Sequence, residues 1–239
     1  FIQIKLEFVT KFFNVKKKIK ITVVGIGLMG SQHLQAIKFS KRAKLHSIVD
    51  INKKSITLAK KFKVPFYNSP KELLKNKKPD AVIVATPNHF HEKHTINFLN
   101  EKIPVLLEKP ISTNISNAKK IIRSSKKNKT KLLIGYHRRH NNIISKVKNR
   151  IKSGSLGKIV AANVMCWLYK NKEWYKEKWR IKKGGGPLGI NLVHDIDLIC
   201  YLLGTITHVQ ATTSNKIRKY DVEDTAIVNL TFKSGALCT

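Results

Sequence analysis

The sequence has few cysteines and no long apolar run. Cys166, Cys200 and Cys238 lie far apart and form no C-x-x-C pair and no zinc-finger spacing, and such an odd, sparse set suits a reducing compartment. No run approaches the roughly 20 apolar residues that span a bilayer. Residues 1–15 are interrupted by charges and make a poor signal peptide. We therefore expect a cytoplasmic protein that does not associate with a membrane.

Acidic side chains are also scarce. The chain has 14 acidic and 47 basic residues, which gives a formal net charge of +33. Only seven of the basic residues are Arg, whose planar forks make most specific contacts to nucleic acids, and the 40 Lys are spread along the whole chain. We predict solvated lysine-rich faces and no specific nucleic-acid partner. Loose polyanion binding or an acidic substrate is the alternative.

Both ends of the sequence are unusual. The chain begins with Phe1, its first methionine is Met29, and it stops in an apparent strand after a turn at 233–235. These features indicate a fragment, and residues 1–18 are an extension of doubtful status. The 239 residues are nevertheless enough to bury a core, as one or two domains.

The most informative stretch is a glycine-rich turn. The apolar run 21–24 ends in Gly25, Gly27 and Gly30, with the spacing G-x-G-x-x-G, and an amphipathic run follows. In a dinucleotide-binding unit the first glycine permits the tight turn, the second lets the backbone approach a pyrophosphate, and the third lets the helix pack closely. The helix start adds N–H groups and a dipole that favour an anion. A purely structural strand–helix turn is the alternative.

An acidic residue follows at the distance that this motif requires. Asp50 ends the apolar run 45–49 and lies twenty residues after Gly30. An acid at this spacing accepts a hydrogen bond from the ribose 2′-OH of the cofactor. Its charge disfavours a 2′-phosphate, so we predict NAD, while the nearby Lys53 and Lys54 leave NADP possible.

Strands and helices are expected to alternate through residues 19–136. Apolar runs at 80–85, 104–107 and 131–136 alternate with helical runs, which is typical of a doubly wound parallel sheet, the Rossmann fold. Right-handed crossovers bring the carboxyl ends of all strands to one edge, where ligands bind. The segments expected at that edge are 25–30, Asp50, 86–88, 108–110 and 137–139.

The pattern changes after residue 136. Helices are predicted at 141–152 and 191–203, and strands at 159–169, 206–213 and 225–232. Long strands with hairpin links are typical of a mainly antiparallel sheet. We therefore expect an α/β protein in which residues 137–239 form a second, α+β domain with an open sheet that is incomplete in this sequence.

Five short motifs occur in a characteristic order. They are the glycine turn at 25–30, ATPNHFH at 85–91, EKP at 108–110, GYHRR at 135–139, and GGG at 184–186 followed by HDID at 194–197. Together they resemble the glucose–fructose oxidoreductase / inositol dehydrogenase (Gfo/Idh/MocA) family. The resemblance implies NAD(P)-dependent hydride transfer between the nicotinamide and a secondary hydroxyl of a cyclic polyol, sugar or sugar acid. It also implies a second domain for substrate binding and oligomerisation, and a homo-oligomer at full length.

The resemblance assigns the two catalytic roles. It implies that Lys109 polarises the substrate oxygen and that His194 exchanges the hydroxyl proton, which suits an ammonium and an imidazole of near-neutral pKa. A surface lysine and a core histidine are the alternatives. Inositol dehydrogenases carry an Asp where this chain has Ile190, so the substrate need not be inositol. Asn191, three residues before His194, is expected to share its helical face and to hydrogen-bond a substrate hydroxyl.

The remaining cofactor contacts combine the glycine turn with the family motifs. The expected set is Gly25, Gly27, Leu28, Met29, Gly30, Asp50, Thr86, Pro87, Asn88, His91, Glu108 and Lys109. No metal site is predicted, because His89, His91 and His94 do not share a helical face.

The expected substrate contacts besides Asn191 are Trp179, Arg180 and Arg139. Trp179 and Arg180 are expected in a sugar-stacking lid hinged at 184–186, or else in packing against the sheet or a partner subunit. Arg139 is expected to reach the cofactor or the substrate, or to form a surface ion pair. Asp197 is expected to orient His194 or to be a buried structural carboxylate.

Two alternatives to a dehydrogenase remain. Some proteins of the resembled family cleave glycosidic bonds by transient oxidation with bound NAD, and this chemistry leaves no net NADH. The other alternative is a non-catalytic protein that senses a nucleotide or binds polyanions through its positive charge.

Overall fold

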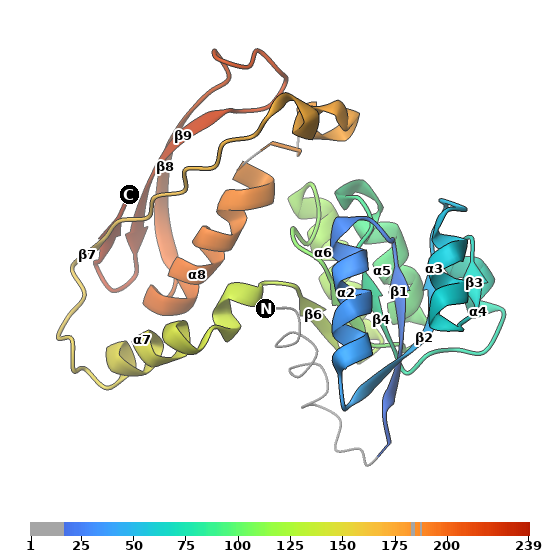
Figure 1. Ribbon diagram of the computed structural model, residues 1–239. Helices are drawn as coiled ribbons and strands as arrows, with labels where there is room; N and C mark the ends of the chain where they lie inside the picture. Colours follow the sequence, from blue (N-terminus) through green and yellow to red (C-terminus); the bar gives the residue numbers. More distant parts are fainter. Residues whose placement is uncertain (1–16, 183–184, 187) are drawn as a thin grey trace. The chain divides into compact units, whose positions relative to one another are not determined.

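A computed structural model describes residues 17–182, 185–186 and 188–239. The chain divides into two compact units, of which the first ends at His137 and the second begins at Arg138 (Figure 1). The doubtful extension predicted at 1–18 lies mostly outside the described residues. Within the described ranges, no helix has the length and apolar character needed to cross a membrane.

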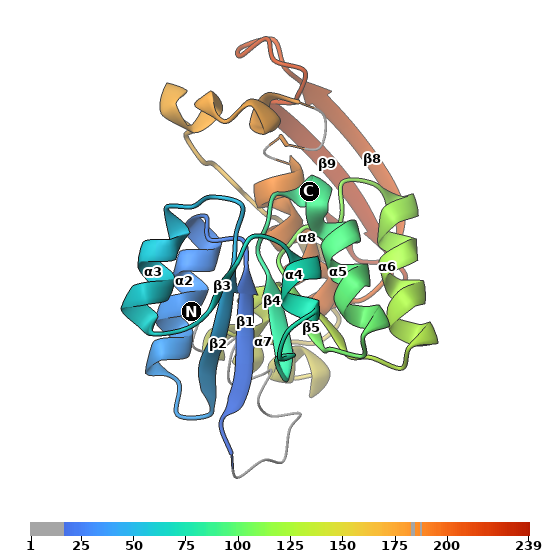
Figure 2. The ribbon, with the colours of Figure 1, turned by 90° about the vertical axis from the view of Figure 1, so that its right-hand side faces the viewer.

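The first unit contains a six-stranded parallel sheet with the strand order β3-β2-β1-β4-β5-β6 (Figure 2). This is the order of a dinucleotide-binding Rossmann sheet, in which the strand order reverses between β1 and β4. The strands are β1 Ile19–Val24, β2 Ala43–Val49, β3 Phe66–Tyr67, β4 Ala81–Val84, β5 Val105–Leu107 and β6 Leu132–Ile134. The helices are α2 Leu28–Phe39, α3 Ser55–Phe62, α4 Pro70–Leu74, η1 Asn88–Phe90, α5 His91–Asn100 and α6 Ile115–Lys127.

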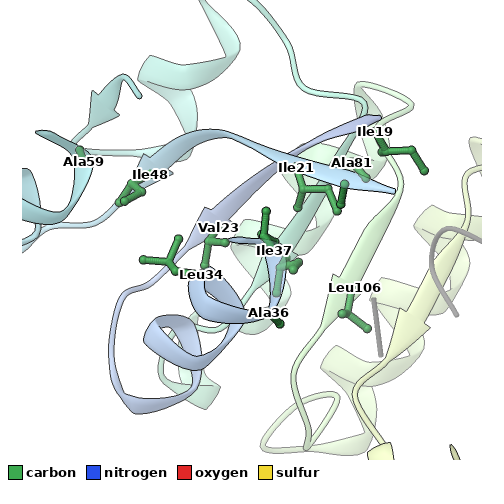
Figure 3. Close-up of a cluster of buried hydrophobic side chains, with 12 residues drawn as sticks. Ile19, Ile21, Val23, Leu34, Ala36, Ile37, Ile48, Ala59, Ala81 and Leu106 are labelled. Carbon is green, nitrogen blue, oxygen red and sulfur yellow. The ribbon is translucent and has the colours of Figure 1, made fainter. Parts of the chain in front are cut away.

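Apolar side chains cover both faces of this sheet. In β4, Ala81 and Ile83 point to a cluster with α2 and α3 (Figure 3), whereas Val82 and Val84 point to a cluster with α4, α5 and α6. Because alternate residues of a strand face opposite sides, a central parallel strand must be apolar at every position. All four residues of β4 are buried, as the apolar run at 80–85 predicted.

Local signals set the starts of two helices. The Ser69 side chain accepts a hydrogen bond from the Glu72 amide at 3.2 Å, with Pro70 as the first residue of α4. The Asn114 side chain accepts from the Asn117 amide at 2.8 Å and so starts α6. These caps fix where the loops at the sheet edge end and the helices begin.

The second unit is a four-stranded sheet with the order β7-β10-β9-β8 and a helix packed on one face. Its strands are β7 Ala161–Ala162, β8 Ile206–Ser214, β9 Thr225–Phe232 and β10 Leu237–Cys238. Its helices are η2 His137–His140, α7 Asn142–Lys152, η3 Lys172–Lys176, η4 Lys178–Ile181, η5 Leu188–Leu192 and α8 Val193–Leu203. The first residue of η2, His137, still belongs to the first unit. Ile199 of α8 packs against Leu230 and Phe232 of β9.

The sheet of the second unit is smaller and more mixed than the sequence suggested. Its β8–β9 and β9–β10 pairs are antiparallel, but β10 pairs with β7 in parallel. The strand predicted at 159–169 is wrong in extent, because only Ala161 and Ala162 join the ladder. An apolar run predicts an extended chain, but a strand also needs a partner on its edge, and the run has such a partner at only two positions.

Candidate functional site

The glycine-rich turn joins β1 to α2 with close backbone contacts. Gly25 has a φ of +87°, and a Cβ there would lie 2.8 Å from the Thr86 amide nitrogen. A Cβ at Gly30 would lie 1.9 Å from the Gly25 carbonyl oxygen, so only glycine lets the first turn of α2 approach the end of β1. A Cβ at Gly27 would meet nothing within 4 Å. The turn is therefore tightly packed on one side and open at Gly27, beside the start of α2 at Leu28 and Met29.

Asp50 follows β2 and binds the same turn. Its Oδ2 accepts a hydrogen bond from the Ile26 amide at 2.6 Å, and its Oδ1 accepts from the Asn52 amide at 2.8 Å. The carboxylate thus holds the glycine turn against the end of β2. Each oxygen keeps acceptor capacity for a further donor, because an ionised carboxylate has about four lone-pair sites.

The loop after β4 carries polar atoms whose hydrogen-bonding capacity is unused. The Thr86 Oγ1 and Asn88 Nδ2 atoms are buried and have no hydrogen-bond partner among the described residues. Such atoms are rare in folded proteins, since leaving one unpaired costs about 1–3 kcal/mol. They lie in the loop that contacts Gly25, so this part of the sheet edge offers donors and acceptors to a polar ligand. Pro87, between them, is exposed.

His91 connects two loops instead of facing outward. Its Nε2 lies 2.9 Å from the Thr86 carbonyl oxygen and its Nδ1 lies 2.8 Å from the Pro110 carbonyl oxygen, and the side chain is buried. Burial lowers the pKa of His91, although both carbonyls favour the charged form. The ring is therefore neutral at neutral pH and donates to one carbonyl at a time. His91, which was predicted to contact the cofactor, is therefore a buried link between the loop at Thr86 and the loop at Pro110.

A buried hydrogen bond that the sequence did not reveal supports the EKP motif. His33 of α2 is fully buried, and its Nε2 lies 2.8 Å from Oε1 of Glu108, which is 4% exposed. The other Glu108 oxygen accepts from the Lys109 amide at 3.3 Å. Glu108 thus joins α2 to the backbone of Lys109, directly after β5. The sequence indicates this contact only through a histidine on the apolar face of a predicted helix. It does not indicate that the partner of this histidine lies 75 positions away.

The predicted residues of the second unit lie around a change of helix type. Leu188–Leu192 forms a π-helical turn, and α8 begins only at Val193. The α-helix predicted at 191–203 is therefore wrong at its start, because Asn191 lies in the π-helical turn and His194 lies in α8. Asn191 and Asp195 line a cavity that His194 does not line, and the Asn191 Nδ2 has no hydrogen-bond partner among the described residues. His194 is buried.

Two arginines of the GYHRR motif bind the two aspartates of the HDID motif. Arg138 pairs with Asp195, and Arg139 makes a two-pronged contact with Asp197, whose Nε–Oδ2 distance is 2.7 Å. Asp197 raises the pKa of Arg139 through these hydrogen bonds. The structure therefore shows Arg139 in the ion pair that was one of its predicted alternatives. These contacts hold η2 against the first turns of α8.

Trp179 and Arg180 lie in η4 within a cluster of aromatic rings. The Arg180 guanidinium stacks 4.6 Å from the Trp174 ring centroid and 5.3 Å from that of Trp179, and it donates to the Trp174 carbonyl at 2.9 Å. A Cβ at Gly185 would lie 2.1 Å from the Trp179 carbonyl oxygen. Gly184 of the predicted hinge lies outside the described residues. The cluster packs within its own segment, so its proposed contact with a sugar stays a prediction.

The edge of the first sheet is suited to a dinucleotide. Its strand ends bring together an anion-favouring helix start, an open backbone at Gly27, a carboxylate at Asp50 and unpaired polar atoms at Thr86 and Asn88. Residues 19–136 match a family model described as an oxidoreductase family with an NAD-binding Rossmann fold, GFO_IDH_MocA. Residues 144–239 match the GFO/IDH/MocA C-terminal domain.

The chain belongs to the Gfo/Idh/MocA family. Myo-inositol 2-dehydrogenase of Thermotoga maritima is 30% identical over 225 residues, which are 91% of this chain and 66% of the relative. The 2,7-anhydro-N-acetylneuraminate hydratase of Escherichia coli is 26% identical, over 91% of this chain and 59% of the relative. A crystal structure of the WlbA dehydrogenase from Bordetella pertussis, in complex with NADH and UDP-GlcNAcA, has a TM-score of 0.89 at 27% identity, covering 94% and 66% of the two chains.

These relatives are longer than the sequence described here. The chain spans 59–66% of their lengths. The two family models match residues of both units of the chain. Membership of this family of NAD-binding oxidoreductases therefore rests on both units of the chain.

The buried His33–Glu108 pair should stabilise the first unit. We expect His33→Leu, which keeps the side-chain volume, to lower the free energy of unfolding by about 1–3 kcal/mol, because a buried carboxylate loses a hydrogen bond. Urea denaturation of His33→Leu, Glu108→Leu and the double variant measures the coupling. The double variant should lose less than the sum of the single losses. Strictly additive losses would contradict the pairing.

The pH dependence of stability should include a contribution from His94. Burial lowers the pKa of His94 from 6.5 to about 4, with smaller contributions from Lys93 and His91. The unfolded chain therefore binds more protons between these two pH values, and stability should fall as the pH falls from 6.5 to about 4. In this pH window, the thermal midpoint of His94→Gln should depend less on pH than that of the parent. The control is His89→Gln, at an exposed histidine, which should keep the pH dependence of the parent. Equal slopes for the parent and His94→Gln would refute the assignment.

Proposed function

We propose that this chain forms the cofactor domain and part of the substrate domain of an NAD-dependent oxidoreductase. It would transfer a hydride between the nicotinamide and a secondary hydroxyl of a cyclic polyol, sugar or sugar acid. The observation that carries this proposal is the glycine turn, with its open backbone at Gly27 and the Asp50 carboxylate at the neighbouring strand end. Relatives that are dehydrogenases of inositol and of a nucleotide sugar support the substrate class.

The cofactor contacts are proposed from the geometry of the first unit. The amides at the start of α2 and the backbone at Gly27 would hold the pyrophosphate, and Asp50 would accept from the adenosine ribose. Thr86 and Asn88 would use their unpaired polar atoms on the cofactor. Since a carboxylate disfavours a 2′-phosphate, we propose NAD as the cofactor, with NADP as the alternative because of Lys53 and Lys54.

The proposed chemistry separates a hydride from a proton. Bound NAD supplies the hydride acceptor. In the direction of oxidation, the carbon–hydrogen bond of the alcohol gives up the hydride and its hydroxyl proton passes to the His194 imidazole. The Lys109 ammonium stabilises the negative charge that develops on the oxygen. Glu108, held by His33, fixes the backbone from which Lys109 extends.

The substrate contacts are proposed in the second unit. Asn191 has an unpaired amide nitrogen at the edge of a cavity, which is suited to a substrate hydroxyl. Ile190 stands where inositol dehydrogenases carry an aspartate, so the proposed substrate need not be inositol. Trp179, Arg180 and Arg139 remain predicted contacts. Cytoplasmic location and self-association of the longer protein remain predictions as well.

A redox-neutral reaction is the second candidate. The hydratase from Escherichia coli matches 91% of this chain, and a hydratase adds or removes water without net oxidation. The same cofactor site would then serve a transient oxidation. Incubation with NAD and a panel of sugars and glycosides separates the two candidates. A dehydrogenase gives net NADH absorbance, whereas a redox-neutral enzyme gives product without that absorbance.

Lys109 provides the test of the proposed chemistry. Titration of the chain with NADH, followed by fluorescence, should show binding that Lys109→Ala leaves nearly unchanged. Turnover with the best polyol or sugar should fall about 10²–10³-fold in Lys109→Ala, because a preorganised positive charge is lost. The matched control is Lys44→Ala, an exposed lysine of β2 that should keep full activity.

Two outcomes would refute the proposal. The first is that the folded chain binds neither form of NAD and neither form of NADP, which would contradict the cofactor assignment. The second is a Lys109→Ala variant as active as the parent, which would remove the assigned role of Lys109 while leaving the cofactor assignment intact.

A further inference from the structure

A carboxylate from the connection between β8 and β9 reaches the helical turn that precedes His194. The Oε1 atom of Glu223 accepts a hydrogen bond from the Leu188 amide at 2.8 Å, although the two residues are 35 positions apart. Leu188 is the first residue of η5, the π-helical turn that leads directly into α8. Glu223 therefore contacts the start of the turn that contains Asn191 and precedes His194.

The contact satisfies one of the amides that a helix leaves without a partner. The first amides of a helix have no acceptor within the helix and need one from outside it. At this turn the Leu188 amide donates to Glu223, and the Ile190 amide donates to the Gly186 carbonyl at 3.1 Å. The helix dipole also favours a carboxylate at this end. Glu223 and Gly186 thus form the cap of the π-helical turn.

The Glu223 carboxylate lies directly against Gly186. A Cβ at Gly186 would lie 2.4 Å from Oε1 and 2.7 Å from Oε2 of Glu223, which is closer than van der Waals contact allows. The φ of Gly186 lies outside the left-handed region, so the backbone does not itself require glycine. Glycine is needed here to leave room for the carboxylate. A methyl group at this position would push the Glu223 side chain away from the Leu188 amide.

The loop that carries Glu223 is held on both sides of this residue. On one side, the Oδ2 atom of Asp224 accepts from the amides of Ile217 and Arg218 at 3.1 and 2.8 Å. On the other side, Val222 is 5% exposed. Because the backbone is restrained on both sides, the Glu223 carboxylate has a fixed base from which to hold the turn.

The position of this turn matters for the proposed site. π-Helical turns are rare and occur frequently at functional sites. This one contains Asn191, the proposed substrate contact, and is followed by His194, to which the substrate proton is proposed to pass. The ion pairs between η2 and α8 hold the first turns of α8, whereas Glu223 holds the turn before them.

We propose that Glu223 is a positioning residue for the proposed reaction. Its carboxylate accepts from the Leu188 amide, fixes the π-helical turn and so sets where Asn191 and His194 meet the substrate. This role needs a hydrogen-bond acceptor and no proton transfer. It also explains the last glycine of the GGG motif as the residue that leaves room for the carboxylate. The proposal rests on the proposed function, which assigns Asn191 and His194 to the substrate.

Four single variants test this role. Glu223→Ala removes the acceptor, whereas Glu223→Gln keeps an amide oxygen in its place. Gly186→Ala leaves Glu223 in the chain but fills the space of its carboxylate. Asp221→Ala removes an exposed carboxylate from the same connection and is the matched control.

Hydrogen exchange measures the hold on the turn without cofactor or substrate. Exchange at the amides of Leu188 and Ile190 should quicken about tenfold or more in Glu223→Ala and in Gly186→Ala, and should stay close to the parent in the other two single variants. A double variant, Gly186→Ala with Glu223→Ala, should exchange no faster than either single variant, because the methyl group then has room. Unchanged exchange in Glu223→Ala, or additive effects in the double variant, would overturn the proposal.

Turnover supplies a readout that a purely structural role would not move. In Glu223→Ala and Gly186→Ala, kcat/KM for the best polyol or sugar should fall about 10- to 100-fold, while the dissociation constant of NADH stays that of the parent. Glu223→Gln should keep most of the activity. The proposal is overturned if Glu223→Ala is as active as the parent, or if Glu223→Gln is as impaired as Glu223→Ala. A parent that neither binds NADH nor turns over a substrate would refute the proposed function, whereas unchanged exchange would refute the hold of Glu223 on the turn.

Discussion

The close approach of two backbones at the glycine turn is the constraint on which the first unit depends. The first turn of α2 lies where any side chain at Gly30 would overlap the Gly25 carbonyl, and Gly25 itself lies against the backbone of the β4 loop. This contact places the positive end of a helix beside the carboxyl ends of the central strands. The other features of the sheet edge, from Asp50 to Glu108, are arranged around that helix start.

Buried and half-buried polar groups then fix the loops around the turn. Asp50 holds the turn to β2, His91 spans the carbonyls of Thr86 and Pro110, and Glu108 joins His33 to the Lys109 backbone. The Asp50–Ile26, His91–Pro110 and His33–Glu108 contacts link residues that follow different strands, so together they join neighbouring loops at the sheet edge. Among the described residues of the loop that contacts the turn, the Thr86 Oγ1 and Asn88 Nδ2 atoms have no hydrogen-bond partner, so they are candidates for contact with a ligand.

The sequence predicted the parts of the structure that depend on local spacing. The glycine turn and the buried strand β4 both have signals within a few residues, and the family motifs extended the argument to the catalytic candidates. The His33–Glu108 pair was missed because its partners meet only through the fold. The predicted start of the helix at 191 was wrong because a π-helical turn precedes α8. The strand predicted at 159–169 was wrong in extent because its edge has a partner at only two positions.

The most direct test of the central claim is NADH binding by Gly27→Val. Gly27 has a φ of −73° and open space where a Cβ would be, so valine fits the backbone and the fold. The account predicts an unchanged thermal midpoint, to within a few degrees, together with a loss of NADH binding, because the side chain occupies the space assigned to the pyrophosphate. A folded Gly27→Val variant that binds NADH as tightly as the parent would contradict the account.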